Sequence, residues 1–139
     1  MAGSADGHVS RMIGRLEKTV IDCPDPRALA EFYAAMLGVP IVEDTPDWVA
    51  IGADRSARVL AFQRCDRYLP PRWPDPAHPQ QAHVDIRVDD VEAAETAVLA
   101  LGARRLPAER EDGFRVFEDP AGHPFCLVFS QADVTAQPA

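Results

Sequence analysis

The sequence contains no long apolar run and few cysteines, and both shortages narrow the class of protein. No stretch approaches the ~20 apolar residues of a membrane-spanning helix, and no basic segment followed by an apolar one marks a signal peptide. The three cysteines, Cys23, Cys65 and Cys126, are widely spaced and odd in number, which fits neither a disulfide framework nor a Cys-x-x-Cys metal knuckle. We therefore expect a cytoplasmic protein with no membrane partner.

Basic residues are also scarce. The chain has 14 Lys and Arg against 22 Asp and Glu, a net charge of −8 at pH 7, so it lacks the basic surface that binding to nucleic acid needs. The negative charge can serve solubility alone, or it can indicate a cationic ligand, and the sequence leaves both readings open. With 139 residues, 47% of them hydrophobic, the chain is long enough for one domain with its own core.

That domain is expected over residues 16–130. Residues 1–15 and 131–139 are small, polar and aperiodic, and we predict a flexible leader and a flexible tail. Residues 66–81 hold five prolines among Tyr68 and Trp73. Because such a segment can be neither a helix interior nor a central strand, we predict a stiff connector whose Tyr and Trp pack back onto the domain.

Residues 16–65, before the connector, have the pattern of a strand, a helix and further strands. Residues 16–21 alternate as a strand does. Asp25 and Pro26 begin a helix, because the Asp side chain can accept hydrogen bonds from the first turn and Pro has no N–H to satisfy. An apolar stripe follows, and Gly38 can supply the left-handed residue that ends the helix. Strands are predicted at residues 41–42, 48–51 and 59–63.

Residues 82–130, after the connector, repeat this plan. A strand begins at His83, with polar and apolar residues alternating through Arg87. Asp89 is predicted to cap a helix, with Glu92 as its capping-box partner, and Gly102 to end it. Strands follow at residues 104–106, 114–118 and 125–129.

The two segments align at a separation of 64 positions through the helix, which pairs Val20 with Val84 and Asp25 with Asp89, and at about 65–67 beyond it. Because the cap, the apolar stripe and the following strands recur in the same order, we predict one module present twice. The fold class is α+β: two tandem βαβββ modules, at 16–65 and 82–130, that form curved mixed sheets around a cleft. A cleft between concave sheets is a natural ligand site.

At this point the residues resemble a known family. Residues 25–38, 83–90 and 119–127, the last reading Asp-Pro-Ala-Gly-His-Pro-Phe-Cys-Leu, are similar to the vicinal oxygen chelate superfamily. This superfamily includes glyoxalase I, extradiol dioxygenases, fosfomycin-resistance enzymes and bleomycin-binding proteins. The resemblance covers residues 16–130 and is strongest to the glyoxalase-like domain branch, in which the Pro-Arg-Trp-Pro-Asp-Pro of residues 71–76 also occurs. It implies paired βαβββ modules and a homodimer.

The resemblance also implies where a metal would bind. Metal enzymes of the superfamily place ligands on the first and last strand of each module. Module two offers His83 and, where the family usually has Glu, Cys126. Module one offers Lys18 or Thr19, and Leu60, none of which is a usual ligand. We therefore expect no cofactor, since His83 and Cys126 alone would hold a soft ion only weakly; a divalent metal bound through His83 is the alternative.

Seven residues are predicted to line the ligand site: His83, Asp85, Arg87, Gln63, Cys126, Trp48 and Trp73. His83 is the best catalytic candidate, because imidazole titrates near neutral pH; the alternative is a hydrogen-bonded cleft residue without chemistry. Asp85 and Arg87 can equally form a surface ion pair. Cys126 stands in an apolar strand and is expected to be an inert thiol, and His123, in a turn, is expected to be structural.

Two functions follow from these residues. One is a small-molecule-binding protein without the usual metal site, similar to the bleomycin-sequestering branch, that binds a cationic ligand. The other is a lyase, isomerase or dioxygenase that uses His83 as acid–base or metal ligand. The missing carboxylates argue against glyoxalase activity itself, which needs a metal to stabilise an enediolate.

Overall fold

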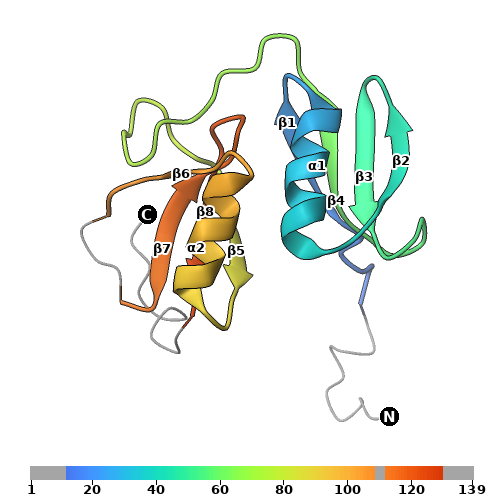
Figure 1. Cartoon of the computed structure of the whole chain (residues 1–139). Helices are drawn as coiled ribbons and strands as arrows, with labels where there is room; N and C mark the ends of the chain where they lie inside the picture. The colour runs from blue at the N-terminus through green and yellow to red at the C-terminus, as the bar shows by residue number, and fades with distance from the viewer. Residues whose placement is uncertain (1–11, 109–111, 130–139) are drawn as a thin grey trace.

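The structure, a computed structural model, describes residues 12–108 and 112–129, and these form two modules of one plan (Figure 1). The first contains β1 (Thr19–Cys23), α1 (Pro26–Leu37), β2 (Ile41–Thr45), β3 (Trp48–Gly52) and β4 (Arg58–Arg64). The second contains β5 (Val84–Arg87), α2 (Val91–Ala100), β6 (Arg104–Arg105), β7 (Phe114–Glu118) and β8 (Pro124–Val128). Residues 1–11 of the predicted leader and the whole predicted tail, residues 131–139, lie outside the described residues.

The two sheets have the same topology. Their strand orders are β1-β4-β3-β2 and β5-β8-β7-β6, and the first strand of each module is parallel to the last while the other pairs are antiparallel. The predicted repeat and the α+β class of two mixed sheets are therefore confirmed. The connector contains neither helix nor strand over residues 66–81, as its prolines predict.

The helix starts show one success and one error of the sequence prediction. Asp25 caps α1 and accepts a hydrogen bond from the Ala28 amide at 3.2 Å, and Gly38 takes the left-handed conformation at φ 69°. In α2 the cap is Asp90, whose side chain accepts from the Ala93 amide at 3.1 Å, and the predicted Asp89 cap is wrong. Two adjacent Asp residues offer the same chemistry, so only the path of the chain into the helix decides between them.

This error shifts the repeat by one residue. The structure pairs Asp25 with Asp90, and the backbone partners Thr19–Leu60 of one sheet match Val84–Phe125 of the other, so the separation is 65 positions at the helix starts and at the first and last strands. The first strand begins at Thr19 and not at residue 16, and β5 begins one residue after His83. Because side chains alternate across a sheet, a slip of one residue exchanges its two faces.

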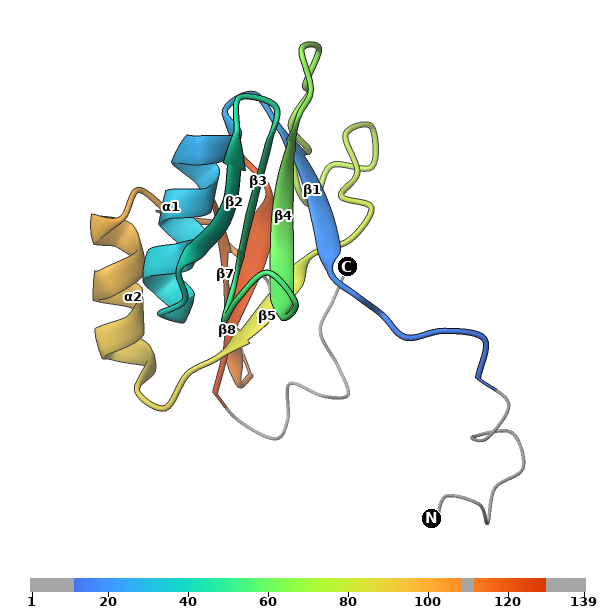
Figure 2. The ribbon, with the colours of Figure 1, turned by 90° about the vertical axis from the view of Figure 1, so that its right-hand side faces the viewer.

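A single hydrophobic core joins the modules. Phe32 and Tyr33 of α1 reach Phe125 of β8, with ring centroids 5.9 and 6.3 Å apart, and Tyr33 also stacks on Phe62 of β4. Figure 2 shows both helices on the same side of the molecule, with the sheets on the other. The two modules therefore form one domain that shares its interior.

The faces of the sheets that point away from this core differ. Over the second sheet, Trp73 of the connector and Leu106 pack on a buried cluster that includes Val116 and Cys126. On the first sheet, Val20 and Val59 are 43% and 47% exposed. Neither α1 nor α2, the helices of the described part of the chain, combines the length and apolar character needed to cross a bilayer.

Candidate functional site

A pocket of about 430 Å³ lies where the two modules meet. One wall is β1, from Thr19 to Asp22, and the opposite wall is the start of β5 and of β8; the connector closes the pocket with Tyr68, Leu69 and residues 79–82. The sequence predicted a cleft between two concave sheet faces, whereas this pocket lies at the junction of the modules. The described residues of its wall include no Lys or Arg, and Asp22 is the one acidic residue among them.

A hydrogen-bond network at the floor of this pocket ties the modules together. The buried Asp119 accepts from the Tyr33 hydroxyl at 2.7 Å and from the amides of Ala121 and His123. His123 places Nδ1 2.8 Å from the same carboxylate and Nε2 2.7 Å from the backbone carbonyl oxygen of Asp22. A carbonyl and a carboxylate can only accept, so both ring nitrogens donate and His123 is held as an imidazolium.

The electrostatics agree with that assignment. Burial by itself would lower the pKa of His123, but the hydrogen bond and charge of Asp119 and the Asp22 carbonyl outweigh burial, so the pKa is raised. Burial, followed by the charge of Asp119, raises the pKa of Tyr33, and that tyrosine stays a hydroxyl that donates. His123 thus has the structural role that the sequence predicted, since it connects β8 to β1.

Tyr68 stands beside this network without joining it. Its ring centroid is 5.2 Å from that of His123, and burial raises its pKa. The buried Tyr68 hydroxyl has no hydrogen-bond partner among the described residues. Because a buried polar atom left unpaired costs about 1–3 kcal/mol, a ligand that enters the pocket and bonds this hydroxyl would recover that energy.

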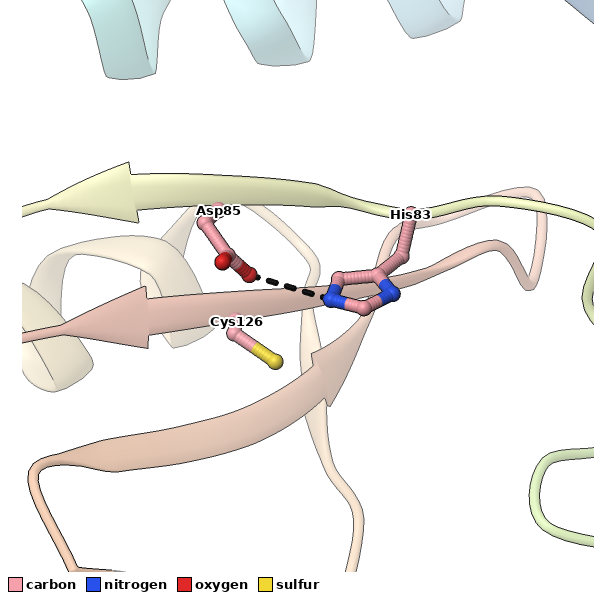
Figure 3. A group of neighbouring side chains, drawn as sticks. All are labelled: His83, Asp85 and Cys126. Carbon is pink, nitrogen blue, oxygen red and sulfur yellow. Dashed lines mark ion pairs between the residues drawn. The ribbon is translucent and has the colours of Figure 1, made fainter. Parts of the chain in front are cut away.

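A second group of polar side chains gathers on the outer face of the second sheet (Figure 3). His83 and Asp85 follow each other along one face of β5, and Cys126 of β8 is the backbone partner of Asp85. His83 Nε2 lies 3.1 Å from Asp85 Oδ1. Burial, the charge of Asp85 and a hydrogen bond to that carboxylate raise the pKa of Cys126 to about 12, so the free thiol is protonated at neutral pH.

The structure divides the seven predicted ligand-site residues into groups. His83, Cys126 and Trp73 line one small void, and Asp85 adjoins it through His83 and Cys126. Arg87 lies two residues farther along β5 and outside the pocket wall. Trp48 and Gln63 lie elsewhere, in a hollow of the first sheet with Asp47, Arg64 and Asp66. A binding role for each of the seven stays a prediction.

The metal site usual in the superfamily does not fit these residues. With the separation of 65, Lys18 occupies in module one the position of His83, and its ammonium lies 5.5 Å from the centre of the Trp48 ring. The sequence alignment placed Leu60 at the position of Cys126, but Leu60 belongs to the core and Ala61 stands there instead. An ammonium and a methyl group cannot bind a cation, so module one supplies no ligand.

Sequence reasoning missed the polar lining of the pocket. The sequence does not single out Asp22, and it marks Asp119 only as the start of the Asp-Pro-Ala-Gly motif in residues 119–127. The one available signal was the prediction that Tyr68 packs back from the connector, which its contact with His123 confirms. Hydrogen bonds between residues as far apart as Tyr33 and Asp119 leave no periodic trace in a sequence.

Comparisons with known proteins were consistent with one another. A family model described as "Glyoxalase-like domain" matches residues 18–128. A glyoxalase/bleomycin resistance protein/dioxygenase family enzyme from Burkholderia phytofirmans is 17% identical with a TM-score of 0.62, over 82% of this chain and 97% of that one. A bleomycin-binding protein from Streptomyces verticillus, in complex with copper(II)-bleomycin, is 19% identical with a TM-score of 0.52, over 86% and 100%. No functionally curated protein matches this chain significantly.

Proposed function

Because this chain belongs to the glyoxalase-like domain family, we propose that it is a small-molecule-binding protein that holds a cationic organic ligand in the pocket between its modules. The observation that carries the proposal is the Tyr68 hydroxyl, a buried group that finds no partner in the described part of the chain and lies in the wall of a pocket of about 430 Å³. Pockets of this size suit drug-like molecules, and a few polar groups in an apolar wall orient them. The superfamily's usual two-module metal site has no part in this binding.

The charge of the pocket supports a cationic ligand. Asp22 is exposed in the wall, and the positive charge of His123 is neutralised by the carboxylate of Asp119. Among residues 12–108 and 112–129, no lysine or arginine lines the wall to oppose Asp22, and the chain as a whole carries a net charge of −8. A positive group near Asp22 with an apolar body against Tyr68 and Leu69 would use both features.

Calorimetry tests this proposal. The probes are metal-free bleomycin and a set of smaller aromatic amines, each paired with its neutral acetylated analogue. We expect binding of amines in preference to their neutral analogues, and Asp22→Asn should weaken it by about 5- to 30-fold, since it removes one charge interaction near the surface. The matched control is Asp47→Asn, in the separate hollow of the first sheet, which should bind as the unmodified protein does. Folded protein that binds none of these probes would contradict the proposal.

One observation favours the enzyme as a second candidate. His83 lines the pocket, and its Nε2 lies 3.1 Å from Asp85, so a carboxylate orients an imidazole that faces the ligand space. Such a pair can move a proton to or from a bound molecule, as an isomerase or lyase requires. A turnover that His83→Gln abolishes while binding persists would establish this function; turnover that survives the substitution would exclude His83 as acid–base.

We further propose that the chain forms a homodimer in the cytoplasm. Support for the dimer comes from Val20 and Val59, which expose apolar surface side by side on the outer face of the first sheet. Sedimentation should then show a dimer, and Val59→Glu should shift it to monomer. A monomer at all concentrations would be evidence against association.

A further inference from the structure

The outer face of the second sheet carries three metal-ligating side chains in one place. His83 lies just before β5, Asp85 lies on β5 and Cys126 on β8, and one donor atom of each lies within 4.8 Å of the other two (Figure 3). The backbone pairing of Asp85 with Cys126 fixes two of them opposite each other across the sheet. Ligand atoms around tetrahedral zinc are separated by roughly 3.3–3.8 Å, as bond lengths of about 2.0–2.3 Å require. Small rotations of the side chains therefore suffice to meet one ion.

The donor set also points to a particular class of metal. Thiolate and imidazole favour zinc and similar borderline ions, whereas magnesium and calcium prefer oxygen ligands alone. The charge of a bound ion would favour the thiolate form of Cys126, because a coordinated thiol is deprotonated. Cys126 would then give its proton to solvent as the sulfur–zinc bond forms, and His83 would bind through a deprotonated ring nitrogen and keep its proton on the other.

A void beside the cluster provides an independent observation. It measures about 10 Å³, about the space of one water-sized probe, and His83, Cys126 and Gln80 line it together with Trp73, Val116 and Pro124. The side-chain oxygen Oε1 of Gln80 is buried and has no hydrogen-bond partner among the described residues. An amide oxygen that has no partner among the described residues and lines the same void as His83 and Cys126 has the chemistry of a fourth ligand.

We propose that His83, Asp85 and Cys126 bind a zinc ion, with Gln80 Oε1 or a water in the fourth position. His83 and Cys126 stand at two of the usual superfamily positions, but the usual site takes its other ligands from module one. Here Asp85 and Gln80 replace them, so all side-chain ligands come from the second module and the connector that precedes it. It revises the sequence-based expectation that His83 and Cys126 alone would hold an ion weakly, since Asp85 and Gln80 add two oxygen donors. Binding of the ion does not depend on the organic ligand proposed above.

Cobalt titration of the full chain tests the site, because a cobalt–thiolate bond produces a charge-transfer absorption that other ligands do not. We expect this band to saturate at one cobalt per chain, zinc to displace it, and magnesium to leave it unchanged. Zinc addition at pH 7 should release roughly one proton per ion. It should also raise the melting temperature of the protein, because it binds the folded state.

Variants assign the ligands. Cys126→Ser should remove the charge-transfer band, and His83→Gln and Asp85→Asn should each weaken cobalt binding by more than about 10-fold. Cys65→Ser, a thiol outside the cluster, is the matched control and should titrate as the unmodified protein does. Circular dichroism confirms that each variant is folded. Absence of the band in the unmodified protein, its persistence in Cys126→Ser, or its loss in Cys65→Ser would overturn the proposal.

Discussion

At the scale of single residues, the polar groups between the modules each have a distinct task. Asp119 accepts hydrogen bonds from four donors, and His123 also donates to the backbone carbonyl of Asp22 in β1. Tyr68 lies against this network with an unpaired hydroxyl. The paired groups hold the structure together, and the unpaired one is the group that a ligand can use.

Tyr68→Phe should separate these two roles. It removes a buried hydroxyl that has no partner, so the free energy of unfolding of the free protein should rise by about 1 kcal/mol. The same change should weaken binding of the amine probes, because the hydroxyl is then missing from the pocket. Urea unfolding and calorimetry on the same preparation measure both effects. A variant that is less stable than the original would show that the hydroxyl is already satisfied, by water for example.

His123 should make stability depend on pH. Its pKa is raised in the folded protein, so its contribution is fully present below the unfolded-state pKa of about 6.5 and is lost as pH rises through the higher folded-state value. The free energy of unfolding should therefore fall from neutral to mildly alkaline pH. His123→Gln, which cannot titrate, should be less stable by about 1–3 kcal/mol and should lack this slope.

Denaturant unfolding at a series of pH values measures this dependence. His78→Gln is the matched control, since His78 is an exposed histidine of the connector whose side chain contacts nearby Asp75. It should keep the alkaline loss of stability. The same slope in His123→Gln would assign the effect to another group.

At the scale of elements, interactions between residues that are close together in the sequence explain most of the secondary structure. Asp25 and Pro26 start α1 and Gly38 ends it, all from interactions within one turn. The prolines of residues 66–81 exclude regular structure just as directly. The start of α2 was placed one residue early because Asp89 and Asp90 have the same capping chemistry, and this displaced the aligned strands with it.

The two aspartates offer a direct test of the corrected register. Asp90→Ala should reduce the free energy of unfolding by about 1 kcal/mol, because the Ala93 amide loses its acceptor. Asp89→Ala, an exposed position outside the helix, should change it by less than about 0.5 kcal/mol. Thermal unfolding of both variants measures the difference. A larger loss at Asp89 would restore the separation of 64 positions.

At the scale of the whole molecule, the shared core makes two repeated modules into one unit. Rings of α1 pack against β8, and Tyr33 of the first module donates to Asp119 of the second. Neither module can lose its packing without exposing the surface of the other. The pocket exists only because the modules are held at this junction.

This coupling predicts one cooperative unfolding transition. Trp48 reports on the first module and Trp73, packed on the second sheet, reports on the second. In variants that keep one tryptophan, the two fluorescence midpoints in urea should coincide. Phe32→Ala should lower both together, with a loss of about 3–5 kcal/mol, because it opens a cavity in the common core. Separate midpoints would mean that the modules fold independently.

Local chemistry in the chain was enough to predict the α+β repeat, the first helix with its caps and the irregular connector. Each of these depends on residues close together or on which residue types are present. The tertiary structure decided the register of 65, the pocket between the modules, the Tyr33–Asp119–His123 network and the meeting of Cys126 with His83 and Asp85. These depend on which strands pair and on which face each residue lies, and a shift of one position reverses the face. The candidate ligands were therefore visible in the sequence, but their grouping was not.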